Sequence, residues 1–178
     1  MSVQYNFQKP ITNKRNFFIN LNLIQSNSQV KIDEFISLYK ISNFWRGKIF
    51  IKKLIHKIFK YRINAKMNWN KNFWNLINVY NAEYDYSLPK EFSNLNDFRK
   101  YVVEQTDSKR MKDILNYEKL ISSGVNINCP LFINGLVLNK IGANVNKNDV
   151  FLIDGSRRLI SNILSGGKYN KALIITCK

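Results

Sequence analysis

The segment VFLIDGSRRLISNILSGG, residues 150–167, brings together residue types that could bind an anion. Its apolar start leads into a turn, and Arg157 and Arg158 follow at the beginning of a predicted helix. Cations are unfavourable there, because helix N-termini already carry partial positive charge, and each arginine costs about 0.3–1 kcal/mol. A bound anion would reverse the sign, since free amides and a guanidinium fork together bind phosphate well. We predict a phosphate- or nucleotide-binding site made by four residues: Gly155, Ser156, Arg157 and Arg158. The alternative is two solvated arginines that the fold tolerates.

Apolar spacing places this motif between a strand and a helix. The run VFLI is typical of a buried strand, and Asp154-Gly155 is typical of a tight turn. Ser156 is a favourable helix N-cap, because its hydroxyl can accept a hydrogen bond from a free amide. The predicted helix ends at Gly166-Gly167 and buries four side chains: Leu159, Ile160, Ile163 and Leu164.

The neighbouring segments predict a compact α/β unit around the motif. Two apolar runs meet at Asn134-Gly135 within LFINGLVLNKIGA, and this pair is a strong hairpin signal. Helical spacing and a short apolar run predict two further helices and a terminal strand: residues 95–104, residues 108–123 and residues 171–177.

The motif resembles the signature of the ParB/sulfiredoxin-like superfamily, in which a strand leads through an acidic or small residue and Gly into an Arg-bearing helix. The upstream YEKLISSGVNINCPLFI is also similar to it, and together the two cover roughly residues 108–177, under half of the chain. The resemblance implies an α/β (α+β) domain with a small mixed sheet and a phosphate-binding Arg helix. Gly155, Arg157 and Arg158 match its phosphate-binding turn. Asp154 matches the position that is acidic in the nuclease-like and serine-kinase-like branches.

The sequence departs from the family pattern at two points, and these reduce the number of branches whose function we expect here. Ser156 stands where sulfiredoxins carry a reactive Cys, and where partition-type members carry a Glu before the Arg pair. The partition-type proteins also continue into a helix-turn-helix DNA-binding domain, whereas this sequence ends at Lys178. We therefore expect neither sulfiredoxin chemistry nor the usual DNA reader.

The function that the resemblance implies is a small-molecule kinase, which moves a phosphoryl group from ATP or ADP, or from CTP, to a small hydroxyl acceptor. Phosphoryl transfer needs anion positioning, a metal and a base. Asp154 is predicted to bind Mg²⁺ or to accept the hydroxyl proton as the base, and Glu118 is the predicted second catalytic carboxylate. A surface salt bridge is the alternative role for Glu118. Three other carboxylates stay open as its replacement: Glu83, Glu91 and Glu104.

Two other function classes stay open. The net charge of +16 and the basic segment at residues 48–62 favour a nucleic-acid-binding protein of partition or mobile-element type. A nuclease of the same superfamily would use Asp154 with a metal, although superfamily nucleases commonly carry a His in this turn, and none is present here.

We expect residues 1–94 to form a helical, basic and aromatic-rich region that precedes the domain at 95–178. Helical spacing predicts helices at 31–39 and 47–62, and another through 69–80. The helix at 47–62 has an apolar stripe beside lysines, which suits packing on its own domain, docking on a membrane or a partner protein, or a phosphate backbone. The aromatic residues near 69–86 could instead stack single-stranded bases.

Composition sets the broad class of the protein. The chain has 178 residues, of which 45% are hydrophobic, enough for a folded core. Its two cysteines, Cys129 and Cys177, are too few and too distant in sequence for a disulfide framework or a C-x-x-C metal site. The first residues lack the apolar core of a secretion signal, and no apolar run approaches a membrane span. We expect a cytoplasmic protein.

Overall fold

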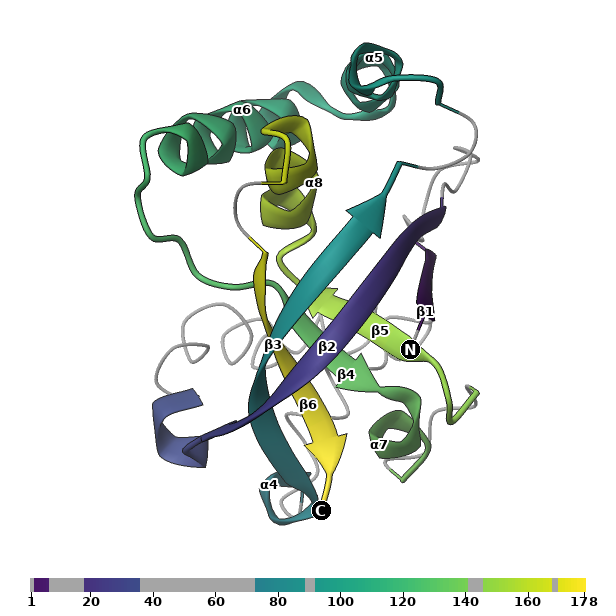
Figure 1. Ribbon diagram of the computed structural model, residues 1–178, viewed down its shortest axis with the longest axis vertical. Helices are drawn as coiled ribbons and strands as arrows, with labels where there is room; N and C mark the ends of the chain where they lie inside the picture. The colour runs from purple at the N-terminus through teal and green to yellow at the C-terminus, as the bar shows by residue number, and fades with distance from the viewer. Residues whose placement is uncertain (1, 7–17, 36–72, 89–91, 141–145, 168–169) are drawn as a thin grey trace, which may run out of the picture.

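A computed structural model describes residues 2–6, 18–35, 73–88, 92–140, 146–167 and 170–178. These residues form a six-stranded mixed sheet in the order β1-β2-β3-β6-β4-β5, with helices packed against it (Figure 1). The strands are β1 (Ser2–Asn6), β2 (Phe18–Val30), β3 (Ile77–Ser87), β4 (Leu131–Asn134), β5 (Val150–Asp154) and β6 (Lys171–Cys177). The helices are α4 (Phe73–Leu76), α5 (Leu95–Gln105), α6 (Ser108–Ser122), α7 (Gly135–Lys140) and α8 (Ser156–Leu164). The predicted α+β class is confirmed.

The sheet is curled as well as mixed. β4 pairs with β6 in parallel, whereas β1–β2, β2–β3, β3–β6 and β4–β5 are antiparallel pairs. The strands at the two ends of the pairing order, β1 and β5, contact each other, and Figure 1 shows them on the same side of the molecule. The sheet therefore curls toward a barrel, with its two edge strands close to each other.

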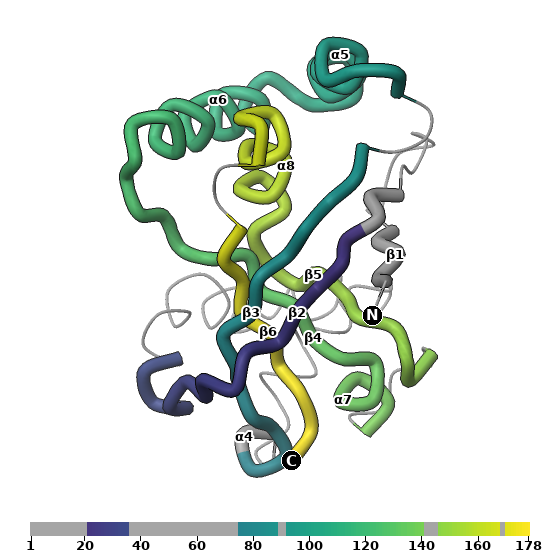
Figure 2. The backbone as a smooth tube through the Cα atoms, in the orientation of Figure 1, coloured from purple at the N-terminus to yellow at the C-terminus, as the bar shows by residue number. Residues whose placement is uncertain are grey.

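Two apolar cores lie on opposite faces of the sheet, because neighbouring side chains of a strand point to opposite faces. On β3, Ala82 and Tyr84 pack into the first core, whereas Ile77 and Val79 pack into the second. Helices α5, α6 and α8 cover the first core at one end of the molecule, and α7 and the C-terminus lie toward the other end (Figure 2). Burial of Leu159 and Ile163 in the first core fixes α8 beneath α6.

Five elements in and around the motif match their predictions. β5, α8 and β6 occupy the predicted segments, and α6 ends one residue before the predicted 108–123. The predicted helix at 95–104 is α5. In these segments, the local sequence signals for the type of element agree with one another.

The predicted hairpin at Asn134-Gly135 is wrong. β4 ends at Asn134, and Gly135 begins α7. The Asn134 Oδ1 atom accepts a hydrogen bond from the Leu136 amide (2.8 Å), and the Gly135 amide donates to the Asp149 carbonyl (2.7 Å). These bonds turn the chain into a helix whose Val137 and Leu138 side chains enter the second core, so β5 pairs with β4 only after this detour.

The predicted helix through 69–80 is confirmed only at residues 73–76 of its described part and is wrong from residue 77 onward. The helix α4 ends at Leu76, and β3 begins at Ile77. Burial then alternates with the two-residue period of a strand, which a helical reading of the aromatic spacing did not capture. Trp69 lies outside the described residues.

The sheet joins the two regions that the sequence separates at residue 94. β1, β2 and β3 precede this position, yet β3 pairs with β6 in the same sheet as β4 and β5. The expectation of a largely helical first region is therefore wrong for its described part, which contributes half of the strands. Of the predicted helix at 31–39, residues 32–35 are helical and Lys31 precedes them, while residues 36–39 fall outside the described ranges, as does all of 47–62.

A membrane span would need a longer and more apolar helix than any found among the described residues.

Candidate functional site

The turn between β5 and α8 is built around Gly155. Gly155 has a φ of +92°, in the left-handed region that favours glycine. A Cβ atom at this position would lie 2.8 Å from the Pro130 Cα atom, so the chain needs glycine for both reasons. The prediction of Ser156 as N-cap is wrong. Gly155 occupies the cap position, and no side chain of the described residues caps the helix.

The start of α8 presents backbone amides. The hydrogen bond from the Leu159 amide to the Gly155 carbonyl (2.9 Å) is the first of the helix. An α-helix leaves the amides before this bond without an acceptor inside the helix, and here they belong to Ser156, Arg157 and Arg158. With no side-chain cap from the described residues, these amides are suited to an anion.

Arg158 holds the turn in place. Its Nη2 atom donates to the Asp154 Oδ2 atom (2.7 Å), and its Nη1 atom donates to the carbonyls of Asn128 (2.6 Å) and Cys129 (3.2 Å). Its side chain is only 11% exposed, and that of Asp154 is 26% exposed. Arg158 thus ties the start of α8 to the segment before β4. Its guanidinium is committed to protein acceptors and is poorly placed for a ligand.

Arg157 is the accessible member of the pair. Its Nη1 atom forms an ion pair of 2.5 Å with the Asp113 Oδ2 atom on α6. The two side chains are 44% and 38% exposed, so solvent screens this contact and a ligand can reach it. The two arginines that look equivalent in sequence therefore have different surroundings.

Arg110 is the site residue that the sequence analysis missed. Helix α6 begins after its N-cap Asp107 and carries the Arg110 Nη2 atom to 3.2 Å from the Ser156 Oγ atom. Burial lowers the pKa of the Arg110 guanidinium, and the Arg157 charge lowers it further, against an opposing effect of Asp107. A partly buried cation beside a second cation is an arrangement that an anion would stabilise. Only the tertiary packing of α6 on α8 places Arg110 there, and no local spacing signals it.

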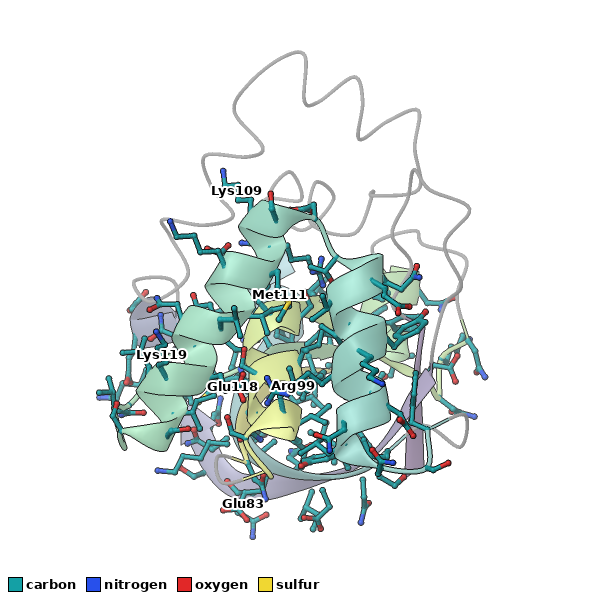
Figure 3. All side chains as sticks on the ribbon, turned by 90° about the horizontal axis from the view of Figure 1, so that it is seen from above. Glu83, Arg99, Lys109, Met111, Glu118 and Lys119 are labelled. Atoms are coloured by element: carbon teal, nitrogen blue, oxygen red, sulfur yellow. The ribbon has the colours of Figure 1, made fainter. Side chains whose placement is uncertain are left out.

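Glu118 does not join Asp154. Figure 3 shows Glu118 and Arg99 pointing toward each other across α8. Both guanidinium Nη atoms of Arg99 donate to the Glu118 carboxylate, at 3.1 and 2.5 Å, and Nη2 also donates to the Leu164 carbonyl (3.4 Å). Leu164 ends α8, whereas Asp154 precedes its start, and a nine-residue helix is about 13 Å long. The predicted catalytic pairing of Glu118 with Asp154 is therefore wrong, and the alternative salt bridge is what the structure shows.

Among the described residues, neither of the other candidate carboxylates forms an ion pair with the turn. Glu83 is exposed on β3 and Glu104 is exposed on α5, while Glu91 lies outside the described residues. Asp113 is the carboxylate that lies next to the turn, because it forms an ion pair with Arg157. The sequence did not single it out.

The turn does not fit a resident magnesium ion. Mg²⁺ prefers carboxylate oxygens and water in octahedral geometry. Asp154 is instead bound to the Arg158 guanidinium, and two further arginines lie at the start of α8. Across the described ranges, no three His, Cys, Asp or Glu side chains gather closely enough to hold a metal ion.

Comparisons with protein-family models, with curated proteins and with solved structures found no match for this chain.

Proposed function

We propose that the chain binds a phosphate group of a nucleotide at the start of α8. The observation that carries the proposal is the position of Arg110, which α6 brings to the Ser156 hydroxyl at the first residue of that helix. The first amides of α8, the Ser156 hydroxyl and the Arg110 guanidinium then lie together, and the exposed Arg157 follows in the same turn of the helix. The resemblance of this segment to the ParB/sulfiredoxin-like superfamily supports the same location.

Phosphate binding is favoured because Arg157 would exchange the Asp113 carboxylate for a phosphate as its partner. The Arg157–Asp113 pair is exposed, and pairs of this kind contribute about 0–1 kcal/mol. A guanidinium–phosphate hydrogen bond contributes about 1.5–3 kcal/mol, because the acceptor is charged and can bridge two donors. A phosphate would also offset the burial of the Arg110 charge and its repulsion by Arg157, which both lower the pKa of Arg110. The free energy lost with the Asp113 contact is therefore smaller than the free energy gained with the phosphate contact.

Phosphoryl transfer to a small hydroxyl acceptor is the reaction that we propose from the resemblance, and it also needs a base. Asp154 is the carboxylate in the turn, with its Oδ2 atom bonded to Arg158 and its side chain 26% exposed. Glu118 is engaged with Arg99 and adds no second carboxylate. The contacts support phosphate binding directly, and they support the transfer step only through Asp154.

Thermal unfolding with ATP, ADP, CTP or GTP tests the proposal, each nucleotide being added with and without Mg²⁺. A nucleotide at a hundred times its Kd should stabilise the protein by about 2.7 kcal/mol. The variant Arg110→Gln should lose about tenfold or more in affinity, since it removes a charged donor worth about 1.5–3 kcal/mol. Its own stability should not fall, because the removed cation is partly buried beside Arg157.

Lys100→Gln is the matched control, because Lys100 is an exposed cation on α5 and its loss changes the net charge equally. It should leave the ligand-induced shift unchanged. Equal shifts in Arg110→Gln and wild type would contradict the site, and the absence of a shift with every nucleotide would contradict nucleotide binding.

A further inference from the structure

Helix α6 carries a row of exposed lysines on its outer side. Lys109, Lys112 and Lys119 are spaced by three and seven residues, which places them within one side of a helix, over about 15 Å of its length. Figure 3 shows Lys109 at the start of α6 and Lys119 farther along the same helix. We call these three residues the α6 lysine row.

The acidic residues of α6 do not neutralise this row. Asp113 is paired with Arg157 of α8, and Glu118 is paired with Arg99 of α5. Both carboxylates that α6 carries within its own span are thus occupied by arginines from other helices. In the part of the chain that the structure describes, no ion pair joins a carboxylate to the lysine row.

An open hollow lies beside the C-terminal end of the row. Leu115, Glu118, Lys119, Ser122 and Ser123 line it, and the Leu115 side chain is 42% exposed. Its lining combines one apolar side chain, two hydroxyls, a lysine and the Glu118 carboxylate, which is paired with Arg99. This combination suits a sugar or base whose phosphates contact the lysines.

We propose that the α6 lysine row binds the phosphate backbone of a nucleic acid, without reading its sequence. Repeated point charges along one helix match a repeated anion, and the net charge of +16 favours the encounter. A membrane surface would require an apolar face beside the lysines, but on α6 the large apolar side chain that is exposed is Leu115. The row is distinct from the proposed phosphate site, because none of its three lysines contributes to the start of α8.

The salt dependence of binding tests this interface. Wild-type protein is titrated with a fluorescent duplex DNA and a single-stranded RNA of random sequence, at several salt concentrations. For each phosphate contact, the slope of log K against log salt changes by about 0.9 for duplex DNA and about 0.7 for a single strand. The triple variant K109Q/K112Q/K119Q should therefore reduce the magnitude of the slope by about 2–3.

The triple variant K140Q/K147Q/K178Q is the matched control, because it removes the same charge from other exposed lysines. Lys140 ends α7 and Lys178 is the last residue, and α7 and the C-terminus lie at the end of the molecule away from α6 (Figure 1). The control should retain the wild-type slope.

Equal slopes for both triple variants would overturn the proposal, as would failure of the wild type to bind either nucleic acid at low salt. Binding to phosphatidylserine vesicles alone would overturn it in favour of a membrane surface. Each of these results is separate from nucleotide binding at the start of α8, which the variants leave intact.

Discussion

At the scale of single residues, the adjacent Arg157 and Arg158 show how the same side chain takes two roles. Arg158 is largely buried and bonded to Asp154 and to two carbonyls, so it stabilises the turn. Arg157 is exposed and holds Asp113 through a contact that a ligand can replace. The unfavourable position of two cations at a helix start is relieved by these two carboxylates.

The two arginines should therefore differ in their effect on stability. Arg158→Ala leaves the Asp154 carboxylate and the Asn128 carbonyl without their guanidinium donor, and we expect the free energy of unfolding to fall by about 2–3 kcal/mol. Arg157→Ala removes a screened pair and should cost less than about 1 kcal/mol. Urea unfolding of both variants measures the difference. Equal losses would contradict the assignment of Arg158 as the structural member.

Sequence reasoning found the turn but only part of its site. Gly155 and the Arg pair stand out locally, because glycine, cations and a helix start occur together in one short segment. Arg110, Asp113 and the Arg99–Glu118 pair depend on how α6 and α5 pack on α8. No spacing within either helix specifies that packing.

At the scale of elements, the strand–turn–helix unit of β5 and α8 depends on the conformation of Gly155. Its positive φ sets the direction in which α8 leaves the sheet, and its lack of a side chain lets the turn approach Pro130. This geometry is what presents the first amides of α8 at the surface.

Gly155→Ala should destabilise the protein in two ways. A positive φ costs a residue with a side chain about 1–2 kcal/mol, and overlap with the Pro130 backbone adds about 1–3 kcal/mol. Gly124→Ala is the matched control, because Gly124 also has a positive φ but a Cβ there meets nothing within 4 Å. Thermal unfolding should show the larger loss for Gly155→Ala. A loss no greater than that of Gly124→Ala would contradict the close approach to Pro130.

Element prediction succeeded where local and tertiary preferences agree and failed where they compete. The α8 segment has helical apolar spacing, a turn before it and glycines after it, and each signal gives the same answer. At Asn134-Gly135 the hairpin signal lost to a helix start stabilised by Leu136 and Asp149. Helical spacing of the aromatics likewise lost to pairing of β3 between β2 and β6.

At the scale of the whole molecule, the sheet unites segments that composition separates. The first core contains Leu21, Leu23 and Tyr84 from before residue 94, together with Leu159 and Ile163 from after it. Sequence composition shifts near this position, but strand pairing between distant segments leaves no compositional trace. The boundary was therefore a natural inference from sequence, and the sheet crosses it.

This shared core predicts that residues 95–178 do not fold alone. The fragment lacks β3, which pairs with β6 along seven residue positions, and it lacks four buried side chains of the first core: Leu21, Leu23, Ala82 and Tyr84. Circular dichroism and thermal unfolding of the purified fragment should show no cooperative transition, while the full chain unfolds cooperatively. A sharp transition of the fragment would show that 95–178 is an independent domain, as the composition suggests.

Phosphate binding at the start of α8 is most directly measured by the amide resonances of that helix. A ¹⁵N-labelled protein titrated with ATP, and separately with inorganic phosphate, should show its largest saturable shifts at three amides: Ser156, Arg157 and Arg158. The same titration of Arg110→Gln should leave them nearly unmoved at equal ligand concentrations, because the guanidinium at the Ser156 hydroxyl is gone. Saturable shifts elsewhere in the protein with these three amides unmoved, or no shifts with either ligand, would contradict the account.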